Sequence, residues 1–167
     1  IHRVFKDKPE GSSSIKPAFL MQHGVFSSSE SYLLNGDRSL AYQFAHHGYD
    51  VWLGNSRQSM YSKSHAFLDP YSWELMDNSF WEFGKYDNPA MIDYVINHTG
   101  NAKISYLGHS EGTSSMLTSL SHNFGDLQSK LNLFVIMAPV TNRVDSREPT
   151  WGIRNNWLIL PSSWIYF

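Results

Sequence analysis

The sequence predicts an α/β protein in which a mostly parallel sheet carries helices on both faces. Short runs of apolar and β-branched residues alternate with segments of helical periodicity along the chain. Glycines follow two of the helix-like segments, where a left-handed residue commonly ends a helix. Because parallel strands need crossover connections, usually helices, this alternation favours a parallel sheet covered on both sides.

The first half of the chain is expected to contribute three strands: residues 3–5 (RVF), 18–22 (AFLMQ) and 49–54 (YDVWLG). Before the third strand, residues 39–48 (SLAYQFAHHG) place small and aromatic side chains at helical spacing, and Gly48 suits the position after a helix. Residues 55–79 have weak periodicity, so we expect a long irregular excursion over the surface there.

The second half opens with a strong helix signal. Asn88 is a good N-cap, Pro89 suits the first helical turn, and Gly100 follows the last residue with helical periodicity. Three further elements are then expected: a strand at residues 103–108 (KISYLG), a helix from about Thr113 to His122, and a fully apolar strand at residues 131–139 (LNLFVIMAP).

Composition excludes several classes of function. The 167 residues, 41% of them hydrophobic, suffice for one apolar core and are too few for two ordinary domains. Thirteen basic against fifteen acidic residues give a net charge of −2 without a basic stripe, so nucleic acid is not an expected partner. The sequence has no window of about 18 uninterrupted apolar residues, so no transmembrane segment is expected.

Metal and cofactor chemistry is not expected either. The chain has no cysteine, which excludes a thiolate nucleophile, a disulfide framework and cysteine-ligated zinc. His46 and His47 are adjacent but lack nearby acids at metal-ligand spacing. We therefore expect no metal site and no cofactor.

A serine between two glycines, in Gly108-His109-Ser110-Glu111-Gly112, carries the strongest chemical signal. It follows a predicted strand and precedes a predicted helix, and ligands of parallel sheets collect at the carboxyl ends of the strands. A nucleophile on so sharp a turn needs small residues two positions before and after it, because side chains there would collide with the strand and the helix. The alternative is a glycine-rich connection without chemistry.

A second segment supports the chemical interpretation. His23-Gly24 lies just past the strand at residues 18–22, where a hydrolase of this architecture supplies one oxyanion donor from its backbone. The N–H groups of Val25 and Glu111 are then the expected donor pair, with the positive end of the helix dipole behind Glu111. Alone, a His-Gly pair after a strand is more often a plain turn.

Five stretches, in the same order and with similar spacing, resemble the acid lipases of the α/β-hydrolase fold, which include gastric and lysosomal acid lipases. They are LMQHGVFSSSESYL, LAYQFAHHGYDVWLGNSR, KYDNPAMIDYVINHTG, ISYLGHSEGTS and MAPV. The resemblance runs to about Val140, and GYDVWLGNSR with KYDNPA is more specific than the serine motif.

The resemblance implies a serine lipase or esterase acting on neutral lipid esters, either triacylglycerols or cholesteryl esters. Ser110 is then the nucleophile, and the amides of Val25 and Glu111 form the oxyanion hole. Secretion or a lysosome-like compartment is implied, and Asn97, in an Asn-His-Thr triplet, matches a glycosylated position of some members. Two residues depart from the family: Glu111 stands where Gln is common, and Gln58 where Gly usually follows NSR.

The acid and base of a catalytic triad are not evident. His122 is the only histidine after Ser110, and a helix between them would carry it about 18 Å away. Asp145 is a weak candidate for the acid. From the resemblance, residues 1–145 are expected to be the N-terminal part of the hydrolase core and residues 146–167 the start of a lid or cap.

The triad aspartate and histidine are accordingly expected outside these residues, in the remainder of the hydrolase, whether in the same or another chain. Two alternatives stay open at this stage. One is a catalytically silent lipase-like subunit that packs within a larger assembly. The other is a peptidase or thioesterase on the same fold, which would use Ser110 in the same way.

Overall fold

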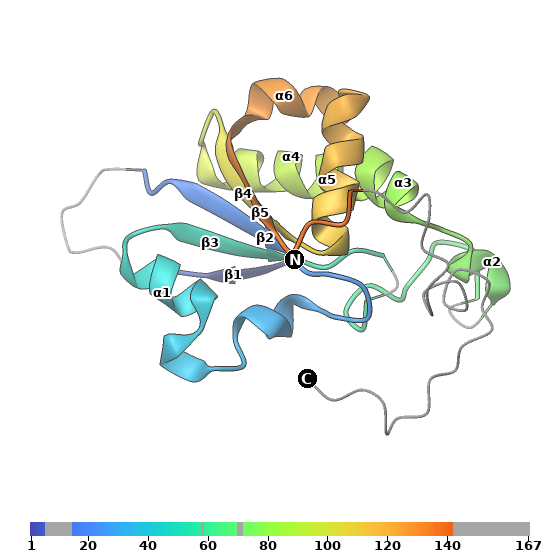
Figure 1. Ribbon diagram of the computed structural model, residues 1–167, viewed down its shortest axis with the longest axis horizontal. Helices are drawn as coiled ribbons and strands as arrows, with labels where there is room; N and C mark the ends of the chain where they lie inside the picture. The colour runs from blue at the N-terminus through green and yellow to red at the C-terminus, as the bar shows by residue number, and fades with distance from the viewer. Residues whose placement is uncertain (6–14, 58, 70–71, 142–167) are drawn as a thin grey trace.

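The computed structural model describes residues 1–5, 15–57, 59–69 and 72–141 (Figure 1). Its sheet has the strands β1 (His2–Val4), β2 (Ala18–Gln22), β3 (Asp50–Gly54), β4 (Ile104–His109) and β5 (Leu131–Met137). They lie in the order β1-β3-β2-β4-β5. β1 pairs antiparallel with β3, and the other pairings are parallel. The predicted fold class, a mostly parallel α/β sheet, is confirmed.

Helices cover both faces of the sheet, as predicted (Figure 1). α1 (Leu40–His46) lies on one face, and α4 (Asn88–Thr99), α5 (Glu111–Ser121) and α6 (Leu127–Lys130) lie on the other. The shorter elements are α2 (Trp73–Met76), α3 (Phe80–Glu82), a π-helical turn (Phe83–Asp87), and the 3₁₀ turns Ser29–Tyr32, Gly36–Arg38 and Phe124–Asp126. Within the described residues, no helix is long and apolar enough to cross a membrane.

The sheet separates two apolar clusters because successive strand side chains point to opposite faces. In β2, Leu20 packs on the α4–α5 side and Met21 on the α1 side, and both are 0% exposed. The α4–α5 side also contains Ala18, Trp52, Ile92, Val95, Ile104, Tyr106, Met116 and Leu127. The central strands are therefore packed against apolar side chains on both faces.

The expectation that Asn88 caps a helix is wrong. The helical segment begins eight residues earlier, at Phe80, where Ser79 and Glu82 form a capping box. Asn88 has helical dihedral angles and is only 1% exposed, and its amide donates to Ser115 Oγ and Ser119 Oγ at 3.3 and 3.0 Å. Its polar side chain thus serves a contact between helices, which the local pattern could not distinguish from a cap.

Pro89 explains the π-helical turn that precedes α4. Inside a helix, a proline lacks the N–H that would bond four residues back, and its ring crowds that carbonyl. The chain responds by widening: Asn88 N–H bonds to Phe83 O, five residues back. The proline therefore lies within one continuous helical segment and not at its start, so the predicted helix boundary moves from residue 88 to residue 80.

The fully apolar strand expected at residues 131–139 is present as β5 and is partly exposed. β5 ends at Met137 and is the last strand of the described sheet, so one of its edges is unpaired. Leu133, Ile136 and Met137 are 53%, 47% and 40% exposed. The predicted boundary between residues 1–145 and 146–167, and Asp145 itself, lie outside the described residues.

Other boundaries differ by a few residues. α5 begins at Glu111 and not at Thr113, and the irregular stretch at residues 55–79 includes the short helix α2. Gly48 and Gly100 have φ values of 92° and 71°, the left-handed conformation expected after helices. These residues end α1 and α4 as the sequence predicts.

Leu20→Ala should lower the free energy of unfolding by about 2–5 kcal/mol, because it leaves a cavity in the centre of the sheet. Leu34→Ala is the matched control: Leu34 is 77% exposed, and its truncation should cost less than about 0.5 kcal/mol. Urea denaturation followed by circular dichroism measures both. Equal effects of the two substitutions would contradict the described core.

Candidate active site

The pairing of β2 with β4 brings the two chemically interesting segments together. The strands are parallel, and Gln22 pairs with Gly108 at their carboxyl ends. The segments that follow β2 and β4 therefore leave the sheet at the same edge and at the same level, so that the turn after His23 meets the turn at Ser110. A Cβ placed on Gly24 would lie 3.0 Å from Ser110 Cβ. The predicted proximity of the two turns is thus present.

Ser110 has an unusual backbone conformation, with φ 51° and ψ −112°. A non-glycine residue with positive φ is uncommon and costs about 1–3 kcal/mol, so surrounding contacts must impose it. Its N–H donates to Met137 O at 2.9 Å, and its C=O accepts from the N–H of Thr113 and Ser114 at 2.9 and 3.3 Å. These bonds join β4, β5 and the first turn of α5 at a sharp bend that leaves Ser110 half-buried.

The two glycines of the serine motif are required by close approach. A Cβ on Gly108 would lie 2.6 Å from Gly112 O, and a Cβ on Gly112 would lie 2.6 Å from Gln22 O. Both contacts involve backbone atoms, which cannot rotate away as a flexible side chain would. The small residues predicted on either side of Ser110 therefore let β4 and α5 close around the serine.

The backbone groups around Ser110 suit a negatively charged oxygen. Glu111 N–H is the first amide of α5, and the positive end of the helix dipole lies there. Val25 follows Gly24 and is 44% exposed, and His109 is also exposed. The arrangement can stabilise charge that develops next to Ser110 Oγ.

Two buried hydroxyl groups brace the turn. Tyr106 OH donates to Gly112 O at 3.1 Å, and Thr113 Oγ1 donates to Gly108 O at 3.0 Å. Burial raises the pKa of Tyr106 well above its ordinary value, so this hydroxyl stays protonated and able to donate. The carbonyls of both motif glycines are therefore held from inside the protein.

An ion pair that sequence reasoning missed fixes the neighbouring loop. Arg57, just past β3, donates through Nε to Asp87 Oδ1 at 2.9 Å and through its backbone N–H to Asp87 Oδ2 at 3.0 Å. Asp87 ends the π-helical turn before α4. The available signal was the specificity of the GNSR and KYDN stretches, which contain the two partners.

The remaining predicted residues lie apart from Ser110. His122 follows α5 directly and contacts Trp81, with ring centroids 4.8 Å apart. Asn97 is exposed on α4. Among the described residues, no side chain forms a hydrogen bond with Ser110 Oγ, and no group of three or more His, Asp or Glu residues could hold a metal ion.

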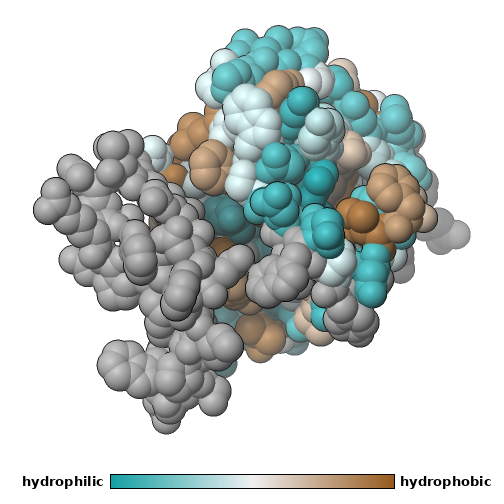
Figure 2. Space-filling model, turned by 90° about the vertical axis from the view of Figure 1, so that its right-hand side faces the viewer, coloured by the Kyte–Doolittle hydropathy of each residue, from teal (hydrophilic) through white to brown (hydrophobic). Residues whose placement is uncertain are grey.

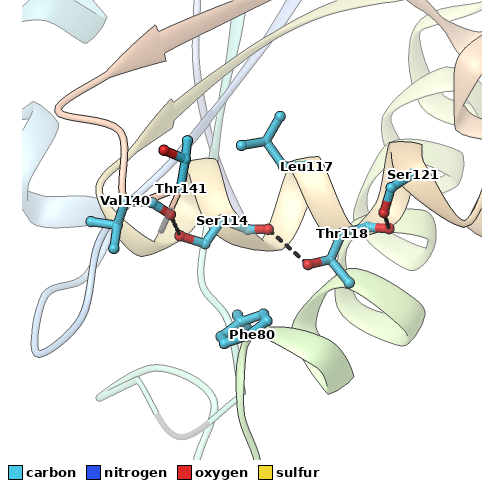
Figure 3. A pocket seen from close by; sticks show the side chains of 7 residues that line it. All are labelled: Phe80, Ser114, Leu117, Thr118, Ser121, Val140 and Thr141. Atoms are coloured by element: carbon cyan, nitrogen blue, oxygen red, sulfur yellow. Dashed lines mark hydrogen bonds between the residues drawn. The ribbon is translucent and has the colours of Figure 1, made fainter. Parts of the chain in front are cut away.

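A pocket of about 370 Å³ lies one helical turn from Ser110, on the outer side of α5, and does not include the serine. Figure 3 shows its lining, which consists of Phe80, Ser114, Leu117, Thr118, Ser121, Val140 and Thr141. Ser114 Oγ donates to Val140 O there. On the face shown in Figure 2, apolar residues of the described part form small separate groups among hydrophilic ones.

Comparison with known proteins decides the family. The sequence model of the family described as alpha/beta hydrolase fold matches residues 17–157. The chain belongs to the α/β-hydrolase family. Among curated proteins, this hydrolase chain is 39% identical over 150 residues to Lipase 3 of Drosophila melanogaster, covering 89% of the chain and 38% of that protein. It is 37% identical over 142 residues to gastric triacylglycerol lipase of Homo sapiens, covering 84% of the chain and 35% of that protein.

The hydrolase chain thus spans little more than a third of the length of these relatives. Solved structures agree on the fold. Lipase BlEst2 of Bacillus licheniformis in its mature form has a TM-score of 0.57 at 18% identity, with 83% of the chain and 46% of that structure covered. A putative lipase from Sulfolobus solfataricus also has a TM-score of 0.57, at 15% identity, with 88% and 47% covered.

Gly112→Ala should destabilise the hydrolase by about 1–3 kcal/mol, because the new methyl group would meet the backbone of Gln22 and His23. The control Ser121→Ala lies at the exposed end of the same helix and should change the free energy of unfolding by less than about 0.5 kcal/mol. Chemical denaturation of both variants tests this. A neutral Gly112→Ala would mean that α5 does not approach β2 as described.

His23 should make stability depend on pH. Burial lowers its pKa below the ordinary value of 6.5, an effect that its hydrogen bond to Gly24 O partly opposes. Folding therefore favours the neutral ring. The resulting contribution of neutral His23 to the free energy of unfolding is fully present above about pH 6.5. It is lost as the pH falls toward the pKa of His23 in the folded state.

Denaturation midpoints of wild type and His23→Asn between pH 8 and pH 5 measure this contribution. The stability lost on acidification should be smaller in His23→Asn, which has no imidazole at this position. Parallel curves for the two proteins would show that His23 ionises equally in the folded and unfolded states.

Proposed function

We propose that this hydrolase is part of a serine lipase or esterase that cleaves neutral lipid esters, with triacylglycerols or cholesteryl esters as substrates. Ser110 Oγ attacks the ester carbonyl, and the backbone N–H groups of Val25 and Glu111 stabilise the tetrahedral oxyanion. The ester class is supported by the relatives, two of which are named lipases at 37–39% identity.

The backbone of Ser110 carries the proposal. A strained φ of 51° persists only where the surroundings impose it. Here the backbone packs so closely around Gly108 and Gly112 that an added Cβ would lie 2.6 Å from a backbone oxygen, and two carbonyls are braced by hydroxyl groups. A turn that served only to connect β4 with α5 would not need this conformation. Strain held at a half-exposed serine, at the carboxyl end of a parallel strand, is typical of a nucleophile.

The reaction also needs a base. A serine hydroxyl becomes nucleophilic when an imidazole takes its proton and a carboxylate orients that imidazole. Because no described side chain bonds to Ser110 Oγ, we propose that the triad aspartate and histidine come from residues beyond those described. They belong to the remainder of the hydrolase, in the same or another chain.

The exposed strand β5 suits such a partner. Parallel sheets are normally covered on both faces, yet Leu133, Ile136 and Met137 are between 40% and 53% exposed. Met137 also accepts the hydrogen bond from Ser110 N–H. We propose that the remainder of the hydrolase packs against β5, which would place the missing acid and base beside the serine.

The location is proposed to be extracellular or lysosome-like. The Asn97 side chain is exposed on α4, so an oligosaccharide could be attached there without disturbing the core. Digestion with peptide-N-glycosidase F should lower the apparent mass of the natural protein, and Asn97→Gln should reduce that shift by the mass of one oligosaccharide.

A fluorophosphonate probe should form one covalent adduct on Ser110 in the full-length protein, located by peptide mass spectrometry. Ser110→Ala should prevent labelling and lower kcat on a triacylglycerol emulsion at least about 10⁴-fold, because both reactions need the activated hydroxyl. Ser129→Ala, at an exposed serine of α6, should leave labelling and rate unchanged.

The outcome separates the alternatives. A folded wild-type protein that neither reacts with the probe nor hydrolyses esters would be a catalytically silent subunit. A protein that reacts with the probe and cleaves peptides or thioesters in preference to triacylglycerols would keep the nucleophile but lose the proposed substrate.

A further inference from the structure

His23 lies between two backbone segments of the candidate site, and the function proposed above gives it no task. It follows β2 directly and is only 4% exposed. Its Nδ1 is 2.8 Å from Gly24 O, and its Nε2 is 3.4 Å from Ser56 N and 3.5 Å from Ser56 Oγ. A buried ring with a contact at each nitrogen is held in one orientation.

The contacts determine which nitrogen carries the proton. A carbonyl oxygen only accepts hydrogen bonds, so the short contact requires that His23 Nδ1–H donates to Gly24 O. A backbone N–H only donates, so Ser56 N–H requires an unprotonated Nε2. Both requirements describe the same neutral tautomer. Burial, which lowers the pKa of His23, favours that neutral form.

The bond to Gly24 O also sets the direction of an amide. Gly24 C=O and Val25 N–H belong to one planar peptide unit, and there is no cis peptide bond among the described residues. In a trans peptide the two groups point in opposite directions. A donor that fixes Gly24 C=O therefore fixes Val25 N–H, and Gly24 lies directly against Ser110.

We propose that His23 is a positioning residue, which aims Val25 N–H at the oxyanion formed next to Ser110 Oγ. The proposal rests on the oxyanion role assigned to Val25 above. Val25 lies in a turn whose next residue, Phe26, has a φ of 56°, so the peptide unit needs an external constraint to keep one orientation. The second bond to Gly24 O, from Ser27 N–H, is longer, at 3.3 Å.

Ser56 is itself anchored, which completes the support. The next residue, Arg57, is bound to Asp87 through both its backbone N–H and its guanidinium. The loop after β3 is thus bound to the π-helical turn that precedes α4. The ring of His23 lies between this loop and Gly24. The orientation of the Val25 amide therefore depends on β2, on the loop after β3 and on the turn before α4.

The test compares two substitutions in the full-length protein. In His23→Asn, the side-chain amide can place a donor where Nδ1 stands. His23→Leu has a similar volume and no donor. With p-nitrophenyl butyrate, His23→Leu should lower kcat about 10- to 100-fold and change KM by less than about 3-fold, because an oxyanion donor acts mainly in the transition state. His23→Asn should recover at least about half of that loss on a logarithmic scale.

His47 provides the matched control. Its Nδ1 also contacts a backbone carbonyl, Gln43 O at 2.7 Å, but it is exposed at the end of α1. His47→Leu and His47→Asn should both keep the wild-type kcat. The kcat is expressed per active enzyme, titrated with the fluorophosphonate probe, so that a smaller folded fraction does not imitate a loss of kcat. Wild-type kcat in a folded His23→Leu would overturn the catalytic part of the inference.

A second measurement does not depend on activity. With ¹⁵N-labelled valine and histidine, the His23 ring should show a protonated Nδ1 and an unprotonated Nε2. The Val25 amide resonance should shift in His23→Leu and return toward its wild-type position in His23→Asn. An unmoved Val25 resonance would overturn the positioning role even if the wild-type protein proves inactive.

The two arms together distinguish this inference from the proposed function. If Val25 moves but kcat does not change, then Val25 is not an oxyanion donor and the inference falls with that assignment. If wild type lacks both esterase activity and probe labelling, the proposed function fails, and the resonance of Val25 still decides whether His23 positions it.

Discussion

The close approach of three backbone segments at Ser110 is the constraint on which this structure depends. β2, β4 and the first turn of α5 meet at distances that leave no room for a Cβ on Gly108 or Gly112. Because the segments cannot separate without breaking the sheet, the serine between them is held at a φ of 51°. The conformation of one residue is thus a property of the packed sheet.

Buried polar contacts keep α5 at that distance. Asn88 donates to two serines of α5, and Ser119 Oγ donates to Gly84 O at 2.7 Å in the π-helical turn. Gly84 lets the helices approach, since a Cβ there would lie 2.7 Å from Ser115 O. Satisfied polar networks of this kind specify one arrangement, whereas apolar packing alone tolerates small shifts. Pro89, which widens the turn, therefore contributes to the placement of the serine.

The candidate site joins residues that lie far apart in the chain. Arg57 and Asp87 are 30 positions apart, and the β2–β4 pairing joins residues more than 80 positions apart. The GNSR and KYDN stretches contain the two partners of this ion pair, whereas any glycine-rich turn can match the serine motif by chance. The ion pair places one constraint on two separate stretches of sequence.

The sequence by itself determined the order and type of the main elements, the glycines that end α1 and α4, and the turn at Ser110, because these follow from patterns within a few residues. Only the tertiary structure decided the strand order, the exposure of β5, the true start of the helix at Phe80, the role of Asn88, and the contacts of His23. Each of these depends on which distant segment lies alongside, and neither side-chain periodicity nor capping preference contains that information.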